Sequence, residues 1–176
     1  MDKADYLKWS RKYDKDQGWN AQKEQELGGR FRKTKTMTLQ DLAEVVEWKF
    51  KDAPESKKQR VLEGVAKNDP AVVTRVSGQV FCVPSGEDSY RMNSLLMING
   101  VSPVIASVIL AFFDPHEYGV FDVRVWRAQL GNEPPNLYTA ANYLKLLASL
   151  RKTADKQNLD VRTVEKALYK KSLDES

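Results

Sequence analysis

The chain contains almost no cysteine or histidine. Among its 176 residues there is one cysteine, Cys82, and one histidine, His116. One cysteine cannot form an internal disulfide or hold a four-cysteine iron–sulfur cluster, and one histidine cannot supply a multi-histidine zinc site. The sequence therefore predicts no metal site and no cofactor, and it favours a reducing compartment.

Glycine and proline are scarce as well, with 9 and 7 residues respectively. Charged residues make up 30% of the chain and hydrophobic residues 41%, which is typical of a folded globular protein. The net charge of +4 permits an anionic partner without requiring one. At this length we expect a single module over residues 1–176.

Long hydrophobic segments are also missing. Residues 1–12 carry six charged side chains and no apolar core, so they do not resemble a secretory signal. Met92–Phe113 is a run of 22 residues without charge, but an Asn-Gly pair and a Ser-Pro pair interrupt its middle. As a helix, the remaining piece Pro103–Phe113 spans roughly 16 Å, against a hydrocarbon core of about 30 Å. We therefore expect two short buried helices and no membrane partner.

Hydrophobic residues recur at helical spacing along most of the chain. Thr38 and Asp41 are spaced as in a capping box. The apolar residues around them fall on one helical face: Leu39, Leu42, Ala43, Val46 and Phe50. Asp69 followed by Pro70 predicts the start of a second helix.

Two further helices are predicted near the C-terminus. One carries an apolar stripe over residues 140–150, and Asp160 caps the other. Val80–Val83 is typical of a short extended piece, but an isolated strand cannot form a sheet. The predicted fold class is therefore all-α, a compact helical bundle.

The large aromatic residues near the N-terminus predict how the chain ends are arranged. They are Trp9, Tyr13 and Trp19, and we expect them to pack onto the C-terminal helices. Residues 38–130 would then form a core lobe, with residues 1–37 and 131–176 packed together as a second helical lobe.

The most informative local pattern is Ile98-Asn99-Gly100-Val101-Ser102-Pro103. Gly100 can take the left-handed conformation that ends a helix running from about Tyr90 to Ile98. Ser102 is a favoured cap, and Pro103 a favoured first residue, for the next helix. Free amides at the start of that helix could bind a phosphate without any lysine. The alternative is that the turn only joins two core helices.

Leu95–Leu130 resembles the helix-hairpin-helix region of the base-excision DNA glycosylases. The pattern of that family is a glycine-containing hairpin, an apolar helix with small residues, and an aspartate just before a helix start. In this chain Gly100 and Val101 fit the hairpin, and Asp122 fits the catalytic aspartate. Val125–Arg127 fits the helix that follows. The resemblance implies a DNA-glycosylase-like fold with a central helix-hairpin-helix and double-stranded DNA as the partner.

The chain departs from the family pattern at three points. Ser102 stands where the second hairpin glycine usually lies, and the iron–sulfur loop is absent. Val104 replaces the lysine that attacks the sugar in bifunctional members, and valine cannot act as a nucleophile. The resemblance therefore implies a monofunctional enzyme that hydrolyses the N-glycosidic bond of a damaged or mismatched base. Its expected location is the cytoplasm, in association with the nucleoid in a bacterium or archaeon.

Asp122 is the candidate catalytic residue. Cleaving an N-glycosidic bond builds positive charge on the sugar, which a nearby carboxylate can stabilise, and a carboxylate can also activate a water. The alternative is that Asp122 only caps the helix over residues 123–130. The candidate DNA-binding residues are Gly100, Val101, Ser102, Pro103, Val104, Arg124 and Arg127.

Other cations could form a diffuse surface that faces phosphates. They are Arg30, Arg32, Lys33, Lys35, Lys170 and Lys171. Two functions other than base removal stay open on the sequence. One is a non-enzymatic DNA-binding protein that keeps the hairpin, and the other is a helical adaptor between proteins.

Overall fold

A computed structural model describes residues 1–175, and all regular secondary structure in this part of the chain is helical. Its ten helices are α1 (Lys3–Gln17), α2 (Trp19–Thr34), α3 (Leu39–Lys49), α4 (Glu55–Ala66), α5 (Pro70–Cys82), α6 (Asp88–Leu95), α7 (Pro103–Phe113), α8 (Val123–Leu130), α9 (Ala140–Gln157) and α10 (Val161–Asp174). The all-α prediction is confirmed.

Local capping signals set most of the helix starts. Thr38 and Asp41 form the reciprocal hydrogen bonds of a capping box at the start of α3. Asp69 accepts a hydrogen bond from the amide of Ala71 and precedes Pro70 at the start of α5. Both predicted helix starts are confirmed.

Two details of the predicted segments are wrong. α5 continues through Cys82, so Val80–Cys82 is helical and only Val83, the residue after the helix, is extended. Val80 is fully buried, and the Phe81 ring stacks on Phe113 at a centroid distance of 4.2 Å. This packing keeps the segment helical. α6 ends at Leu95 rather than Ile98, because the chain then tightens into turns with i to i+3 hydrogen bonds.

Asp160 precedes α10 as predicted, but its side chain does not cap the helix. The amides of Val161 and Arg162 donate instead to the backbone carbonyls of His116 and Pro115. The Asp160 carboxylate lies 2.5 Å from Nδ1 of His116 on the surface. The loop before Tyr118 therefore supplies the acceptors at the start of α10.

α7 lies at the centre of the molecule, and all of its residues from Ile105 to Phe113 are buried. α2 packs closely on it because Gly28 has no side chain: a Cβ there would lie 2.5 Å from the carbonyl oxygen of Phe112. Arg32, one turn further along α2, donates to that same oxygen at 2.7 Å. Within residues 1–175, no helix is both long and apolar enough to cross a membrane.

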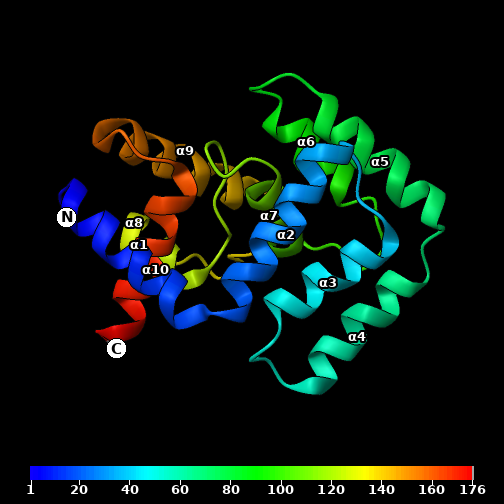
Figure 1. Cartoon of the computed structure of the whole chain (residues 1–176), viewed down its shortest axis with the longest axis horizontal. Coiled ribbons are helices and arrows are strands. Elements are labelled where there is room, and N and C mark those ends of the chain that lie inside the picture. The colour runs from blue at the N-terminus through cyan, green and yellow to red at the C-terminus, as the bar shows by residue number, and fades with distance from the viewer. Residues whose placement is uncertain (176) are drawn as a thin grey trace.

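The first and last helices lie side by side at one end of the molecule, next to α8 and α9 (Figure 1). Tyr13 packs edge to face on Tyr169 of α10, as expected, whereas Trp19 is 54% exposed and does not pack there. α2 packs mainly on α7 and α3, and α8 on α10 and α9. The division into two lobes stays a prediction.

Candidate functional site

The turn between α6 and α7, which we call the elbow, comprises residues 98–104. Gly100 has φ of +82°, so it takes the left-handed conformation predicted for it. Ser102 is exposed, and its hydroxyl accepts a hydrogen bond from the amide of Ile105 at 3.4 Å. Pro103 is the first residue of α7. The elbow lies at the surface, although Val101 is buried within it.

α4 holds the elbow in place by contacts that the sequence pattern does not indicate. Gly64 touches it so closely that a Cβ there would lie 3.2 Å from Cα of Gly100. The side-chain amide of Asn68 donates to the carbonyl of Asn99 at 2.9 Å, and its oxygen accepts from the Asn99 amide at the same distance. The backbone of the elbow is therefore fixed on one side.

Several amides of the elbow have no hydrogen-bond partner within residues 1–175. Val101 donates to the carbonyl of Ile98, Ile105 donates to Ser102, and proline has no amide hydrogen. Within residues 1–175, the amides of Gly100 and Val104, like that of Ser102, make no hydrogen bond. The amides of Ser102 and Val104 lie at the positive end of α7, which is the arrangement that binds anions. The nitrogen of Gly100 instead faces α4, since a Cβ at Gly64 would lie 3.4 Å from it.

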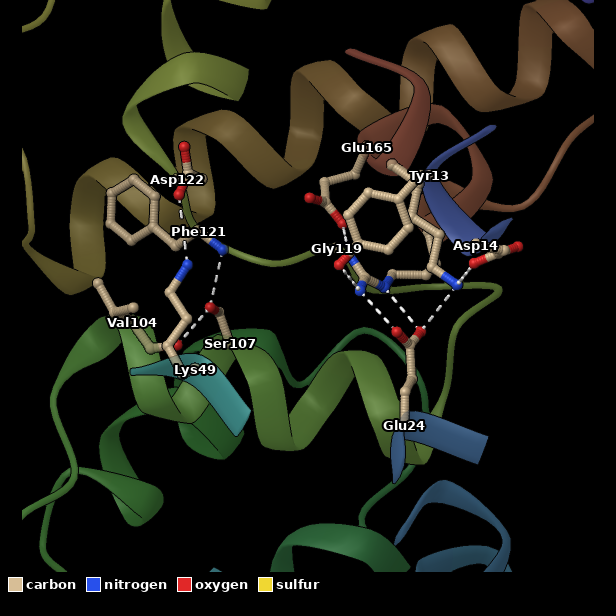
Figure 2. Close-up of polar contacts among 12 residues, drawn as sticks. Tyr13, Asp14, Glu24, Lys49, Val104, Ser107, Gly119, Phe121, Asp122 and Glu165 are labelled. Atoms are coloured by element: carbon tan, nitrogen blue, oxygen red, sulfur yellow. Dashed lines mark hydrogen bonds and ion pairs between the residues drawn. The ribbon is translucent and has the colours of Figure 1, made fainter. Parts of the chain in front are cut away.

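A buried serine connects the elbow to Asp122. The hydroxyl of Ser107, which is completely buried, donates to the carbonyl of Val104 at 2.6 Å. It also accepts from the amide of Phe121 at 2.8 Å. Figure 2 shows this serine between the first turn of α7 and the segment that carries Asp122. The elbow and the aspartate therefore hold a defined separation.

Asp122 caps α8 as predicted, with Oδ1 accepting from the amide of Arg124 at 2.9 Å. The second carboxylate oxygen of Asp122 also has a partner within the chain. Oδ2 lies 3.3 Å from Nζ of Lys49, the last residue of α3 (Figure 2). The side chains of both residues are less than one-fifth exposed.

Lys49 is the residue that sequence reasoning missed. Burial lowers the pKa of its amine, and the Asp122 carboxylate opposes part of this shift. A lysine in the last turn of a helix is common because the helix dipole favours it, and 73 residues separate Lys49 from Asp122. The sequence therefore offers no signal for the pair.

Lys49 and Asp122 line a small polar cavity of about 70 Å³. Its other lining residues are Tyr13, Gln17, Asn20, Trp48, Lys51, Asp52, Val120, Arg162, Glu165 and Tyr169. Asn20 is 5% exposed, and its side-chain oxygen has no hydrogen-bond partner among residues 1–175. A buried acceptor without a partner is rare, so the cavity is suited to a molecule that donates a hydrogen bond.

Arg162 and Glu165, which line the cavity on the side away from Lys49, belong to a buried ion network. Arg162 is paired with Glu24 at 2.8 Å and with Glu165, and Lys166 reaches Glu24 at 3.2 Å. Figure 2 places Glu24 and Glu165 beside Tyr13, on the side away from Lys49. Every charge in this network has a partner, so the network is structural and keeps α1, α2 and α10 together.

The two arginines predicted to contact DNA, Arg124 and Arg127, lie at different places on α8. Arg124 lies in the first turn of α8, two residues after the cap Asp122. Arg127 is held by Glu133 at 2.7 Å and 2.5 Å, and this pairing lowers the pKa of Glu133 to about 2. Arg127 is therefore already engaged on the surface.

Most cations of the expected diffuse surface are used within the chain. Arg30 pairs with Asp41 at 2.8 Å, and Lys170 with Asp16 at the same distance. Arg32 binds the end of α7, and Lys171 pairs with Glu175. In contrast, Arg60 and Lys67 are exposed on or next to α4, the helix that contacts the elbow.

Within residues 1–175, no group of three or more histidine, cysteine, aspartate or glutamate side chains is arranged to hold a metal ion. Comparisons of the chain with protein-family models, with curated proteins and with solved structures find no match. The likeness to the helix-hairpin-helix glycosylases therefore rests on the pattern from Leu95 to Leu130 alone.

Proposed function

We propose that the chain binds duplex DNA through the elbow and hydrolyses the N-glycosidic bond of a damaged or mismatched base at Asp122. The observation that carries this proposal is the link from Val104 through Ser107 to Phe121. It holds an anion-binding turn and a carboxylate in one rigid arrangement, as a reaction on a bound strand requires.

The elbow would bind the DNA backbone. Free amides at the start of α7 can donate to a phosphate. The exposed cations Arg60 and Lys67 lie on or next to α4, the helix that contacts the elbow, and would add positive charge on that side of the molecule. Asp122 would then stabilise the positive charge that develops on the sugar, or activate a water that attacks it. The target base must leave the stack before either step.

The test is incubation with duplex oligonucleotides that carry a panel of modified or mismatched bases, with abasic-site formation as the readout. Asp122→Asn should abolish base release and leave DNA affinity unchanged, because asparagine can still cap α8. Asp155→Asn, at an exposed position of α9, is the matched control and should retain both. Retention of base release in Asp122→Asn contradicts the assignment.

A specific observation favours a second candidate, a DNA-binding protein without catalysis. The cavity beside Asp122 is about 70 Å³, whereas ligand pockets usually measure roughly 300–1,000 Å³. Both oxygens of Asp122 also have partners. Such a protein would show salt-dependent DNA association and release no base from any substrate of the panel. An adaptor between proteins would show no such association.

A further inference from the structure

A surface pocket of about 440 Å³ lies where the end of α2 meets the segment that follows α7. Its lining residues are Arg32, Lys35, Phe113, Asp114, Pro115 and His116. Unlike the cavity beside Asp122, this pocket falls within the range of roughly 300–1,000 Å³ that is usual for small-molecule sites. The proposed hydrolysis at Asp122 uses none of its residues.

Cationic side chains gather around Phe113, which lines this pocket. Nζ of Lys35 lies 5.0 Å, and the guanidinium carbon of Arg91 5.9 Å, from the centroid of its ring. Arg32 uses one nitrogen, Nη1, to donate to the carbonyl oxygens of Phe112 and Phe113. Within residues 1–175 none of these cations forms an ion pair, so their charge is free to attract an anion.

Arg91 places part of this positive charge in the interior. It is 5% exposed, and its Nε and Nη1 have no hydrogen-bond partner among residues 1–175. The Asp88 carboxylate interacts with Arg91, but both of its oxygens are already held by Arg151, at 2.5 Å and 3.0 Å. A buried charge without a close counter-charge is costly, so an anion beside Phe113 would stabilise this region.

Lys35 occupies its position at a cost to the backbone. Its φ is +55°, a left-handed conformation that residues other than glycine rarely adopt. Its amide ends α2 by donating to the carbonyl of Phe31, which a glycine would do without strain. The lysine therefore brings to the pocket a charge that the unstrained residue would not supply.

The acidic groups near the pocket are engaged elsewhere. Oδ1 of Asp114 accepts from the amides of His116 and Glu117, at 3.2 Å and 3.3 Å. The Asp160 carboxylate is paired with His116 at 2.5 Å. Arg32 covers the last carbonyls of α7, which offsets the negative end of that helix. Lys35 and the remaining nitrogens of Arg32 are therefore the groups that can bind a ligand.

We propose that this pocket binds a small organic anion, whose carboxylate or phosphate group pairs with Lys35 and Arg32. Both head groups are planar or compact oxyanions of the kind that guanidinium and ammonium groups recognise. The body of the ligand packs on the apolar part of the lining, Phe113 and Pro115. The inference does not depend on the proposed DNA-binding function.

The experiment titrates the full chain with defined probes and follows its backbone amides by NMR. Benzoate and phenyl phosphate carry the two head groups on the same apolar body. Benzyl alcohol lacks the charge, and inorganic phosphate lacks the body. We expect saturable shifts at Lys35 and Asp114 with benzoate or phenyl phosphate, and the tighter of the two identifies the head group. Benzyl alcohol and inorganic phosphate should bind more weakly by about tenfold or more.

Variants of Lys35 separate binding from folding. Lys35→Gln should weaken binding of the preferred anion by about tenfold. Lys35→Gly should weaken it equally while raising the thermal unfolding temperature, because glycine relieves the left-handed backbone. Lys33→Gln is the matched control, since Lys33 is exposed on the same helix and does not line the pocket.

The inference is overturned by the absence of saturable shifts with both organic anions, or by equal affinity for the charged and uncharged probes. Unchanged binding in Lys35→Gln also overturns it. A parallel loss of duplex DNA affinity in Lys35→Gln would assign the pocket to a DNA interface instead. Base release by the unchanged chain is measured separately, so none of these results decides the function proposed for Asp122.

Discussion

Ser107 and Phe121 are 14 residues apart in the sequence, and the amide of Phe121 donates to the hydroxyl of Ser107 at 2.8 Å in the buried interior. Ser107→Ala leaves that amide without an acceptor. We expect this variant to lose about 1–3 kcal/mol of unfolding free energy. If Ser107 positions Asp122, base release should fall while DNA affinity, which depends on the elbow amides, changes little.

Chemical denaturation and the base-release assay measure these two effects. Ser89→Ala is the control, since Ser89 is exposed on α6. Its unfolding free energy should stay within about 0.5 kcal/mol of the unchanged chain. Equal behaviour of the two variants contradicts the role given to Ser107.

The adjacent glycines of α2 should respond in opposite directions to the same substitution. A Cβ at Gly28 would lie 2.5 Å from the carbonyl oxygen of Phe112, whereas a Cβ at Gly29 meets no atom within 4 Å. We expect Gly28→Ala to cost about 1–3 kcal/mol through overpacking. Gly29→Ala should stabilise the chain by about 0.5–1 kcal/mol, because alanine favours the helix. Thermal unfolding of the pair provides the measurement.

Asn68 should control the affinity for DNA without touching it. Its side chain makes two hydrogen bonds with the backbone of Asn99, so Asn68→Ala frees one side of the elbow. We expect weaker binding of duplex DNA, by about fivefold if the lost order costs about 1 kcal/mol. Asn93→Ala, at an exposed position of α6, should bind normally in the same fluorescence anisotropy titration.

Glu24 should make the chain sensitive to acid. Burial alone would raise its pKa, but the charge and hydrogen bonds of Arg162, aided by Lys166, hold the pKa below its ordinary value of 4.5. A carboxyl group with a lowered pKa in the folded state contributes stability above its unfolded pKa. This contribution is lost as the pH falls through the folded value. The unfolding free energy should therefore drop below about pH 4.5.

Glu24→Gln tests this directly. It leaves Arg162 with an incomplete partner set, so we expect a loss of roughly 3–5 kcal/mol at pH 7. Its stability should also fall less steeply between pH 5 and pH 3 than that of the unchanged chain. Glu63→Gln, at an exposed position of α4, should alter neither quantity. An unchanged acid slope in Glu24→Gln would show that other carboxyl groups dominate.

Structural features that depend on residues adjacent in the sequence could be predicted from the sequence. The Ser-Pro pair marks the first residue of α7, and the conformation of Gly100 follows from the elbow pattern. The end of α5 could not be predicted, since the stacking of Phe81 on Phe113 keeps that segment helical. Tertiary contacts decide such cases against local propensity.

The sequence likewise predicts only the part of the candidate site that depends on local sequence. Asp122 follows from its place before a helix start. Its partner Lys49 and the Asn20 acceptor come from distant segments, and the spacing of residues carries no information about them. The elbow similarly gives no hint that Asn68, 31 residues earlier than Asn99, holds its backbone.

The packing of α1 on α10 has a consequence for synthesis on the ribosome. α1 makes most of its contacts with α10, and the two helices are separated by most of the chain. Translation proceeds at about 5–20 residues per second, so the apolar face of α1 waits many seconds for its partner to emerge. During that interval Tyr6 and Tyr13, both buried in the finished fold, face the solvent or a chaperone.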